Sequence, residues 1–225
     1  MPKQAFIQAG LVGVALFSSG AMVAAGPRVT RDARGLGVAR LSAVSGPERP
    51  VVMASPELAS WLLHMREEEK IARDVYRTLG QLWGVNVFSN ITSSEQNHMN
   101  SMASMLDRYG LPDPVVDDST GVFTNPAFAE LYTLLVERGS ESLMEGYKVG
   151  AKIEELDIVD LREAIVGAQD PVLISVYENL LRGSRNHLRA FARQIYNNGG
   201  TYEAEHLTQE EFDEIANSDF EPGGN

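Results

Sequence analysis

The chain has 225 residues, of which 44% are hydrophobic, and its formal net charge is −12. This length and hydrophobic content favour a folded domain with its own core and argue against a disordered chain. Because the sequence has no cysteine, disulfides, thiolate metal sites and cysteine nucleophiles are excluded. The acidic charge argues against nucleic acid as a partner. Any metal site must therefore use His, Asp, Glu or Met side chains.

The first 25 residues have the pattern of a secretory signal peptide. Lys3 precedes an apolar run from Phe6 to Phe17, and the small residues of Val23–Ala25 provide a cleavage site. The run is shorter than the roughly 20 residues that span a bilayer; a short membrane anchor is the alternative interpretation. We therefore predict a signal peptide over 1–25, an exported protein (periplasmic or secreted) and no stable membrane span after cleavage.

Two segments flank the predicted folded domain. Residues 26–54 mix Gly, Pro, Ser and Arg without sustained periodicity, which is typical of a flexible linker. Residues 199–225 form a Gly-rich and acidic C-terminal tail, in which Leu207, Phe212 and Ile215 predict one short docking helix. The domain itself is expected over residues 55–198.

Helix signals divide this domain into five segments. A capping side chain precedes proline at Ser55-Pro56, Asn125-Pro126 and Asp170-Pro171, which is typical of a helix start. Thr92–Glu95 has capping-box spacing, and Ser140 or Ser142 could begin another helix. With glycines as stop signals, we expect helices near 56–80, 91–109, 126–138, 141–166 and 171–198. The fold class is therefore all-α, a four-helix bundle with an additional short helix between the second and third bundle helices.

Four of these helices carry an apolar seam with steps of three and four residues, as bundle helices do. Each seam is interrupted near its middle by ionisable side chains. The interrupting residues are Glu69, Glu95, His98, Glu154, Asp157 and His187. Isolated buried charges are very costly, so these groups must take up protons, pair with cations or bind metal. Two divalent ions would neutralise the four carboxylates, and the sequence predicts a shared metal site.

Each residue also has an ordinary interpretation. Glu95 could be the capping partner of Thr92, Glu69 could lie on a solvated face beside Arg73, and the histidines could be satisfied core residues. Asp157 could pair with Lys148 or face water, and Glu155, one step off the seam, is the rival of Glu154 as a ligand. His64 and His206 have no evident partner at ligand spacing and are set aside.

Several strings resemble a known family. Glu95-x-x-His98 resembles the signature of ferritin-like carboxylate-bridged di-metal proteins, and Glu69 with Ala72 and Tyr76 resembles the first-helix signature of rubrerythrins. The strings at Met65–Lys70, Ser94–Met99, Val149–Glu155 and Gly183–Phe191 together are similar to the ferritin-like family called domain of unknown function 2202, over about residues 55–215. The resemblance implies a ferritin-like bundle and a di-metal site, without a settled activity.

One position departs from the ferritin-like pattern. Three residues before the histidine of the last bundle helix the pattern has Glu, whereas this chain has Ser184. We expect Asp157, on the neighbouring helix, to supply the missing carboxylate.

Carboxylate and imidazole ligands together suit Fe or Mn and tolerate Zn. The expected cofactor is two divalent metal ions, with Fe preferred and Mn or Zn as alternatives. The expected partners are O2 or peroxide and an electron donor, which would make the protein a di-iron oxidoreductase, with Tyr76 as its candidate catalytic residue. The alternative is a non-catalytic iron or copper binding, storage or delivery protein, in which Met99, Met102 and Met105 would favour Cu(I). The sequence leaves a homodimer open.

Overall fold

The computed structural model describes residues 53–223, and within that range it contains six helices and no strand. The helices are α2 (Pro56–Trp83), α3 (Asn86–Arg108), α4 (Pro126–Gly139), α5 (Leu143–Gly167), α6 (Pro171–Asn197) and α7 (Gln209–Asn217). The prediction of an all-helical domain is confirmed. The predicted signal peptide (1–25) and nearly all of the predicted linker (26–54) lie outside the described residues.

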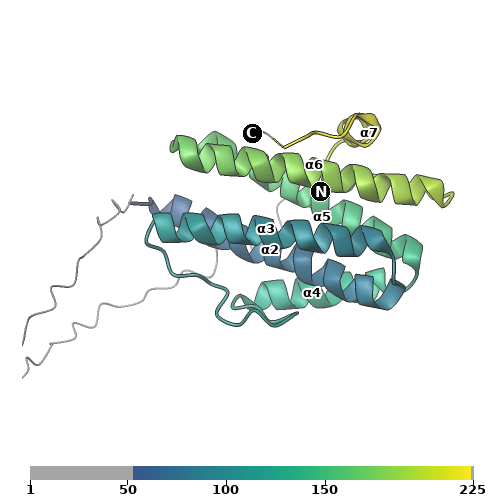
Figure 1. Ribbon diagram of the computed structural model, residues 1–225, viewed down its shortest axis with the longest axis horizontal. Coiled ribbons are helices and arrows are strands. Elements are labelled where there is room, and N and C mark those ends of the chain that lie inside the picture. Colours follow the sequence, from purple (N-terminus) through teal and green to yellow (C-terminus); the bar gives the residue numbers. More distant parts are fainter. Residues whose placement is uncertain (1–52, 224–225) are drawn as a thin grey trace, which may run out of the picture.

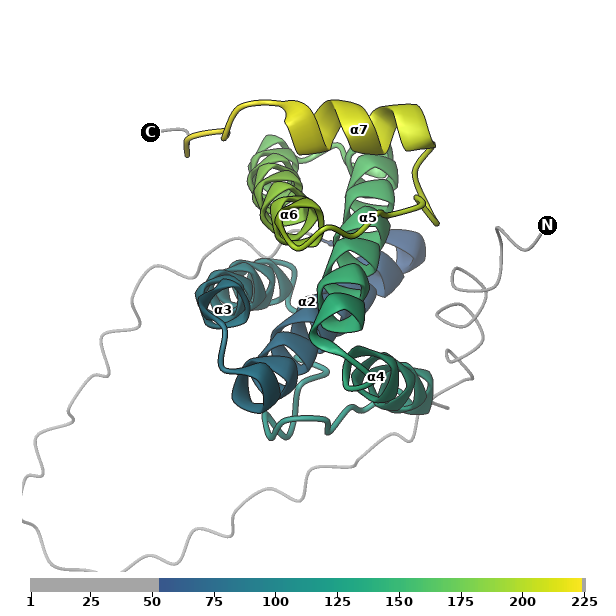
Figure 2. The same cartoon turned by 90° about the vertical axis from the view of Figure 1, so that its right-hand side faces the viewer.

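Four long helices lie lengthwise beside one another (Figure 1). The short link at Gly84 and Val85 joins α2 to α3, and these two helices pack against each other. Another short link joins α5 to α6, which also pack against each other. Seen along the helices, α4 packs on α2 and α5 at one side of the molecule, whereas α7 packs on α6 at the other side (Figure 2). The long helices therefore share an interior that α4 and α7 flank. No helix among residues 53–223 has the length and the apolar character that crossing a membrane requires.

The predicted helix starts at proline are confirmed. The side chains of Ser55, Asn125 and Asp170 accept hydrogen bonds from the first-turn backbone N–H groups of α2, α4 and α6. Ser142, rather than Ser140, caps α5 by accepting from the backbone N–H of Glu145 at 3.1 Å. Capping side chains therefore fix these boundaries because they satisfy N–H groups that a helix leaves unpaired.

The predicted boundary between the first two helices is wrong. Helix α2 continues past Gly80 to Trp83 and ends at Gly84, whose φ of 65° is the left-handed conformation that favours glycine. Helix α3 begins at Asn86, so Thr92 lies inside it and donates its hydroxyl hydrogen to the Phe88 carbonyl at 2.8 Å. The apparent capping box of Thr92–Glu95 is therefore not a cap.

The core has two apolar clusters with a polar layer between them along the long helices. One cluster includes Tyr76, Phe88 and Phe191, and the other includes Leu62 and Tyr177. On all four long helices, the residues that interrupt the seams lie between residues of the first cluster and residues of the second. The interior is therefore apolar at both ends and ionisable in the middle.

The last described residues are held to α6 by an ion-pair cluster. The Glu221 carboxylate accepts from Arg185 Nε at 2.7 Å and from Arg189 Nη2 at 2.5 Å. The hydrogen bonds from Arg185, followed by those from Arg189, lower the pKa of Glu221 from 4.5 to about 2. The stabilisation from this carboxylate is thus present above the unfolded pKa and is lost as the pH falls toward the folded pKa.

We therefore expect Glu221→Gln to lower the melting temperature at pH 7, because it removes the anion that both guanidinium groups bind. The difference from the wild type should stay constant above about pH 5 and shrink between about pH 4.5 and pH 2. Thermal unfolding followed by circular dichroism measures this. The control is Glu203→Gln, an exposed residue for which the pH profile should match the wild type. A difference that does not change with pH would contradict the assignment.

Candidate metal centre

Five of the six predicted site residues meet in the polar layer. Glu69 comes from α2, Glu95 and His98 from α3, Glu154 from α5 and His187 from α6. Glu95 and His98 are three residues apart, which places them on the same side of α3. The carboxylate residues are at most 1% exposed, and the histidines are below 10%. The helix periodicity read from the sequence therefore directs these side chains to one place.

Glu95 joins the two histidines. Its Oε2 lies 2.8 Å from Nδ1 of His98, and its Oε1 lies 2.7 Å from Nδ1 of His187. Glu69 Oε2 lies 3.1 Å from the same nitrogen of His98, and Glu154 Oε2 lies 3.4 Å from that of His187. Two groups of three donor atoms result, and in each group the atoms lie within 4.8 Å of one another. Each group could hold one ion, with Glu95 shared between them.

Several donor atoms here are buried without a hydrogen-bond partner. They are Oε1 of Glu69, both carboxylate oxygens of Glu95 and of Asp157, Oε2 of Glu154 and Nδ1 of His187. The contacts of Glu95 with Nδ1 of the two histidines are therefore short, but they do not satisfy its oxygens as hydrogen bonds of good geometry. Such buried polar atoms are costly. This donor set fits a pair of divalent ions, because metal ligation would satisfy the unpartnered oxygens and the charge together.

Nearby cations do not compensate the carboxylates. Arg66 binds Asp113 at 2.9 Å, while Lys70 and Arg73 bind Asp74 at 2.5 and 2.8 Å. Among residues 53–223, no lysine or arginine forms an ion pair with Glu69, Glu95, Glu154 or Asp157. The basic residues near Glu69 in the sequence therefore do not reduce the negative charge of the centre.

The protonation equilibria of the metal-free site reflect this excess of carboxylates. Burial raises the pKa of Glu69 to about 7, against the lowering effect of His98. Burial and the neighbouring Glu68 charge raise the pKa of Asp157. Burial lowers the pKa of His187, but Glu95 and Glu154 outweigh this effect and raise it to about 10. Without a bound ion, protons would balance part of this charge, and binding of a divalent ion would release them.

Three residues outside the ligand groups shape the site. Tyr76 Oη donates to Oε1 of Glu154 at 2.6 Å, and Ser94 Oγ lies 2.9 Å from Nε2 of His187. A Cβ atom at Gly183 would lie 2.5 Å from Nε2 of His98. Gly183 therefore leaves room for the imidazole, while Tyr76 and Ser94 orient two of the donor groups. No pattern in the sequence indicated the role of Ser94, because Ser94 and His187 lie on different helices.

Asp157 is buried near the centre but belongs to neither group of donor atoms. Burial, and then the charges of Glu68, Glu154, Glu69 and Glu95, raise the pKa of Asp157. Ser184 is also buried, and its hydroxyl donates to the Leu180 carbonyl at 3.2 Å. The expectation that Asp157 replaces the glutamate that is absent at Ser184 therefore stays a prediction.

The structure overturns the ordinary interpretations of the carboxylates. Glu155 is not the rival ligand, because its carboxylate accepts backbone N–H groups of Glu205, His206 and Leu207, the last two at 2.8 Å. Glu69 is buried rather than on a solvated face. Lys148 pairs with Glu145 at 3.0 Å and not with Asp157.

Sequence reasoning missed a second group of ligating side chains. His64, set aside above, lies beside Glu68 and Asp160. Glu68 follows His64 by four residues on α2, a spacing that places both on one face of the helix and was the available signal. Asp160 lies off the seam of α5, so the seam pattern could not include it.

Two cavities reach residues of the polar layer, one at Asp157 and the other at His187. One, of about 220 Å³, is lined by Asp157 and by apolar residues such as Phe128 and Ile153. The other, of about 330 Å³, is lined by His187 together with Ser94 and Arg193. Small molecules could therefore reach the polar layer from two sides.

The fold and the site define an all-helical protein with a buried cluster of carboxylates and imidazoles. The chain belongs to the family described as an uncharacterized protein domain, DUF2202, whose model matches residues 58–219. It is 48% identical over 179 residues to the uncharacterized protein MJ0754 of Methanocaldococcus jannaschii, which covers 80% of this chain and 95% of that protein. A crystal structure of hypothetical protein MJ0754 from Methanococcus jannaschii matches with a TM-score of 0.74 and 48% identity, over 76% of this chain and 98% of that chain.

The Glu155 contacts predict that this residue anchors the segment before α7. Glu155→Gln leaves one oxygen to accept bonds from several backbone N–H groups, so we expect stability to fall by about 1–3 kcal/mol. Backbone amides of Glu205–Leu207 should exchange faster with deuterium. Hydrogen exchange and chemical denaturation measure the two effects, with Glu163→Gln, an exposed residue of the same helix, as the control. Unchanged exchange at these amides would show that the anchor is misassigned.

Proposed function

We propose that this protein is a ferritin-like metal-binding protein with a rubrerythrin-like two-ion centre, iron being the preferred metal and Mn or Zn the alternatives. The observation that carries the proposal is the position of Glu95. Each of its oxygens faces a different histidine, and each histidine is also close to a second carboxylate from another helix. A carboxylate shared in this way is suited to bridging two ions.

The ligand set would assign one ion to Glu69, Glu95 and His98 and the other to Glu95, Glu154 and His187. Oxygen donors with one imidazole for each ion suit Fe(II) and Mn(II), and they do not favour Cu(I). Met102 and Met105 belong to the apolar cluster beside Leu62, which supports their role as core residues rather than as copper ligands.

We propose oxidoreductase chemistry at this centre, with O2 or peroxide and an electron donor as partners. Bound iron would supply the electrons for reduction of the oxidant. Tyr76 holds a proton at Oη, 2.6 Å from Glu154, and so fixes the orientation of that carboxylate. Because Tyr76 acts through Glu154, we assign it as a positioning residue. The cavity lined by His187 and Ser94 gives a small oxidant a way in. An exported location is part of the proposal and rests on the signal-peptide pattern of residues 1–25, which lie outside the described range.

Removing a histidine tests the centre. We expect His98→Ala and His187→Ala each to weaken binding of at least one Mn(II) or Fe(II) ion by roughly 100-fold, because each removes one of three protein ligands. Anaerobic titration with elemental analysis after dialysis measures the loss, and circular dichroism checks folding. Glu163→Gln, exposed on α5, should bind as the wild type does. Equal metal content in the wild type and both histidine variants would refute the centre.

A turnover measurement separates an enzyme from a storage protein. With Fe(II) and a reductant, we expect continued consumption of O2 or peroxide, and Tyr76→Phe should slow it by roughly 10-fold or more, because Glu154 loses the donor that orients it. Tyr109→Phe is the matched control, since Tyr109 bonds Asp170 away from the centre. Metal content measured in parallel shows whether the slower rate arises from lost iron. A single stoichiometric oxidation without further consumption would favour storage.

A further inference from the structure

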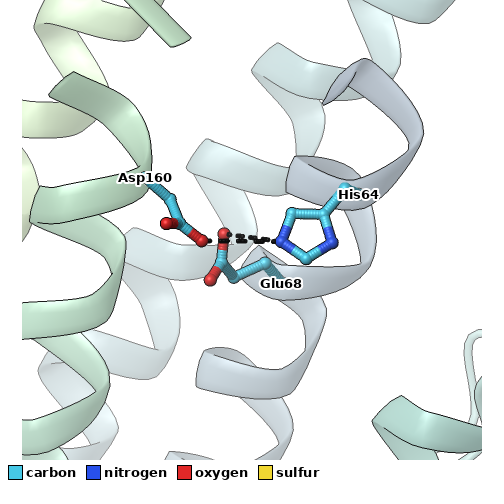
Figure 3. A group of neighbouring side chains, drawn as sticks. All are labelled: His64, Glu68 and Asp160. Carbon is cyan, nitrogen blue, oxygen red and sulfur yellow. Dashed lines mark ion pairs between the residues drawn. The ribbon is translucent and has the colours of Figure 1, made fainter. Parts of the chain in front are cut away.

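A second set of ligating side chains lies beside Glu69, on a neighbouring face of α2. His64 and Glu68 come from α2, and Asp160 comes from α5. Figure 3 shows that the imidazole and the two carboxylates point toward one another across the gap between the two helices. His64 Nε2 lies 3.7 Å from Oε2 of Glu68 and 3.6 Å from Oδ2 of Asp160. One nitrogen therefore faces two carboxylate oxygens from different helices.

These separations are too long for hydrogen bonds but suit ligands of one ion. Hydrogen bonds between nitrogen and oxygen are about 2.7–3.2 Å long. Two ligands bound at about 2.1 Å to one ion lie roughly 3.0–3.6 Å apart for bond angles of about 90–120°. The contact of His64 with Asp160, at 3.6 Å, is at the upper end of that range, and the contact with Glu68, at 3.7 Å, is 0.1 Å beyond it. A divalent ion between the three side chains would therefore need only small adjustments.

Among the described residues, His64 is the only basic side chain that pairs with the two carboxylates of this group. Glu68 and Asp160 are 5% and 4% exposed, and the Oε2 atom of Glu68 is buried without a hydrogen-bond partner. Within the part of the chain that the structure describes, neither carboxylate pairs with a lysine or an arginine. Two adjacent buried carboxylates repel each other unless a cation or a proton lies between them.

The group is also reachable. The cavity of about 220 Å³ is lined by His64, Glu68 and Asp160 and by Asp157. The His64 side chain is 20% exposed, so the imidazole edge faces solvent. A hydrated ion could reach these side chains from the surface and keep water in its remaining coordination positions. Asp157 lines the same cavity and interacts electrostatically with Glu68 of this group and with Glu69, Glu95 and Glu154 of the buried centre.

We propose that His64, Glu68 and Asp160 form a third divalent-cation site, for Fe(II), Mn(II) or Zn(II), at the cavity that reaches Asp157. One imidazole and two carboxylates make a ligand set of the kind that first-row divalent ions accept. This site goes beyond the proposed two-ion centre and shares no ligand with it. The competing arrangement is a protonated His64 that pairs with both carboxylates and binds no ion.

Mn(II) titration of the full chain tests the site, with bound ions counted by electron paramagnetic resonance and elemental analysis. We expect Asp160→Asn and His64→Gln each to weaken binding of one ion by roughly 10-fold or more, while the ions lost in His187→Ala remain. The double variant His64→Gln/His187→Ala should show the sum of both losses. Glu163→Gln, three residues from Asp160 and exposed, is the matched control. His64→Gln changes a partly exposed side chain, which keeps the test valid if Asp160→Asn folds poorly.

The outcomes separate this proposal from the one above. Equal Mn(II) content and affinity in the wild type, Asp160→Asn and His64→Gln would overturn the third site, whatever happens at the centre. A loss that also occurs in Glu163→Gln would overturn it as well. A loss confined to the His64 and Asp160 variants, with none in His187→Ala, would support the third site and refute the two-ion centre.

Discussion

The main constraint on this fold is the need to compensate a layer of buried carboxylates in its interior. Apolar clusters lie on both sides of this layer, so the carboxylates have little water to solvate them. Charges in such surroundings must be compensated locally, because moving an ion out of water costs far more than one apolar contact returns. Two imidazoles cannot neutralise four carboxylates. Protons or metal ions therefore complete the charge balance, and the helix registers that align the layer determine where they bind.

The lysine and arginine side chains of α2 show that charge compensation differs between the faces of one helix. Arg66 and Arg73 reach toward Asp113 and Asp118 in the segment between α3 and α4, and Lys70 reaches Asp74. This segment covers α2 on the face away from the centre, so the middle of the helix is buried on all sides. The same few turns therefore carry a neutralised outer face and an acidic inner face.

The sequence predicted those features that repeat along one helix. Steps of three and four identified the inward positions of Glu95, His98 and His187, because side-chain direction on a helix follows from spacing alone. It failed at the start of α3, where Thr92 bonds a carbonyl inside the helix although its spacing to Glu95 is that of a cap. It also failed for Asp160, because contacts between helices depend on their relative rotation, which a single sequence does not specify.

Glu154 and Glu155 are adjacent in the sequence, yet they contact different neighbours around α5. One faces the interior layer, and the other receives the backbone of residues 205–207. Proteolysis that released the chain beyond Gly200 would remove the backbone N–H groups that bind the Glu155 carboxylate. It would also expose the face of α5 that this segment covers to water. Loss of the C-terminal segment would thus change the environment of the residue next to Glu154, a candidate ligand. The segment therefore contributes to the structure of the interior.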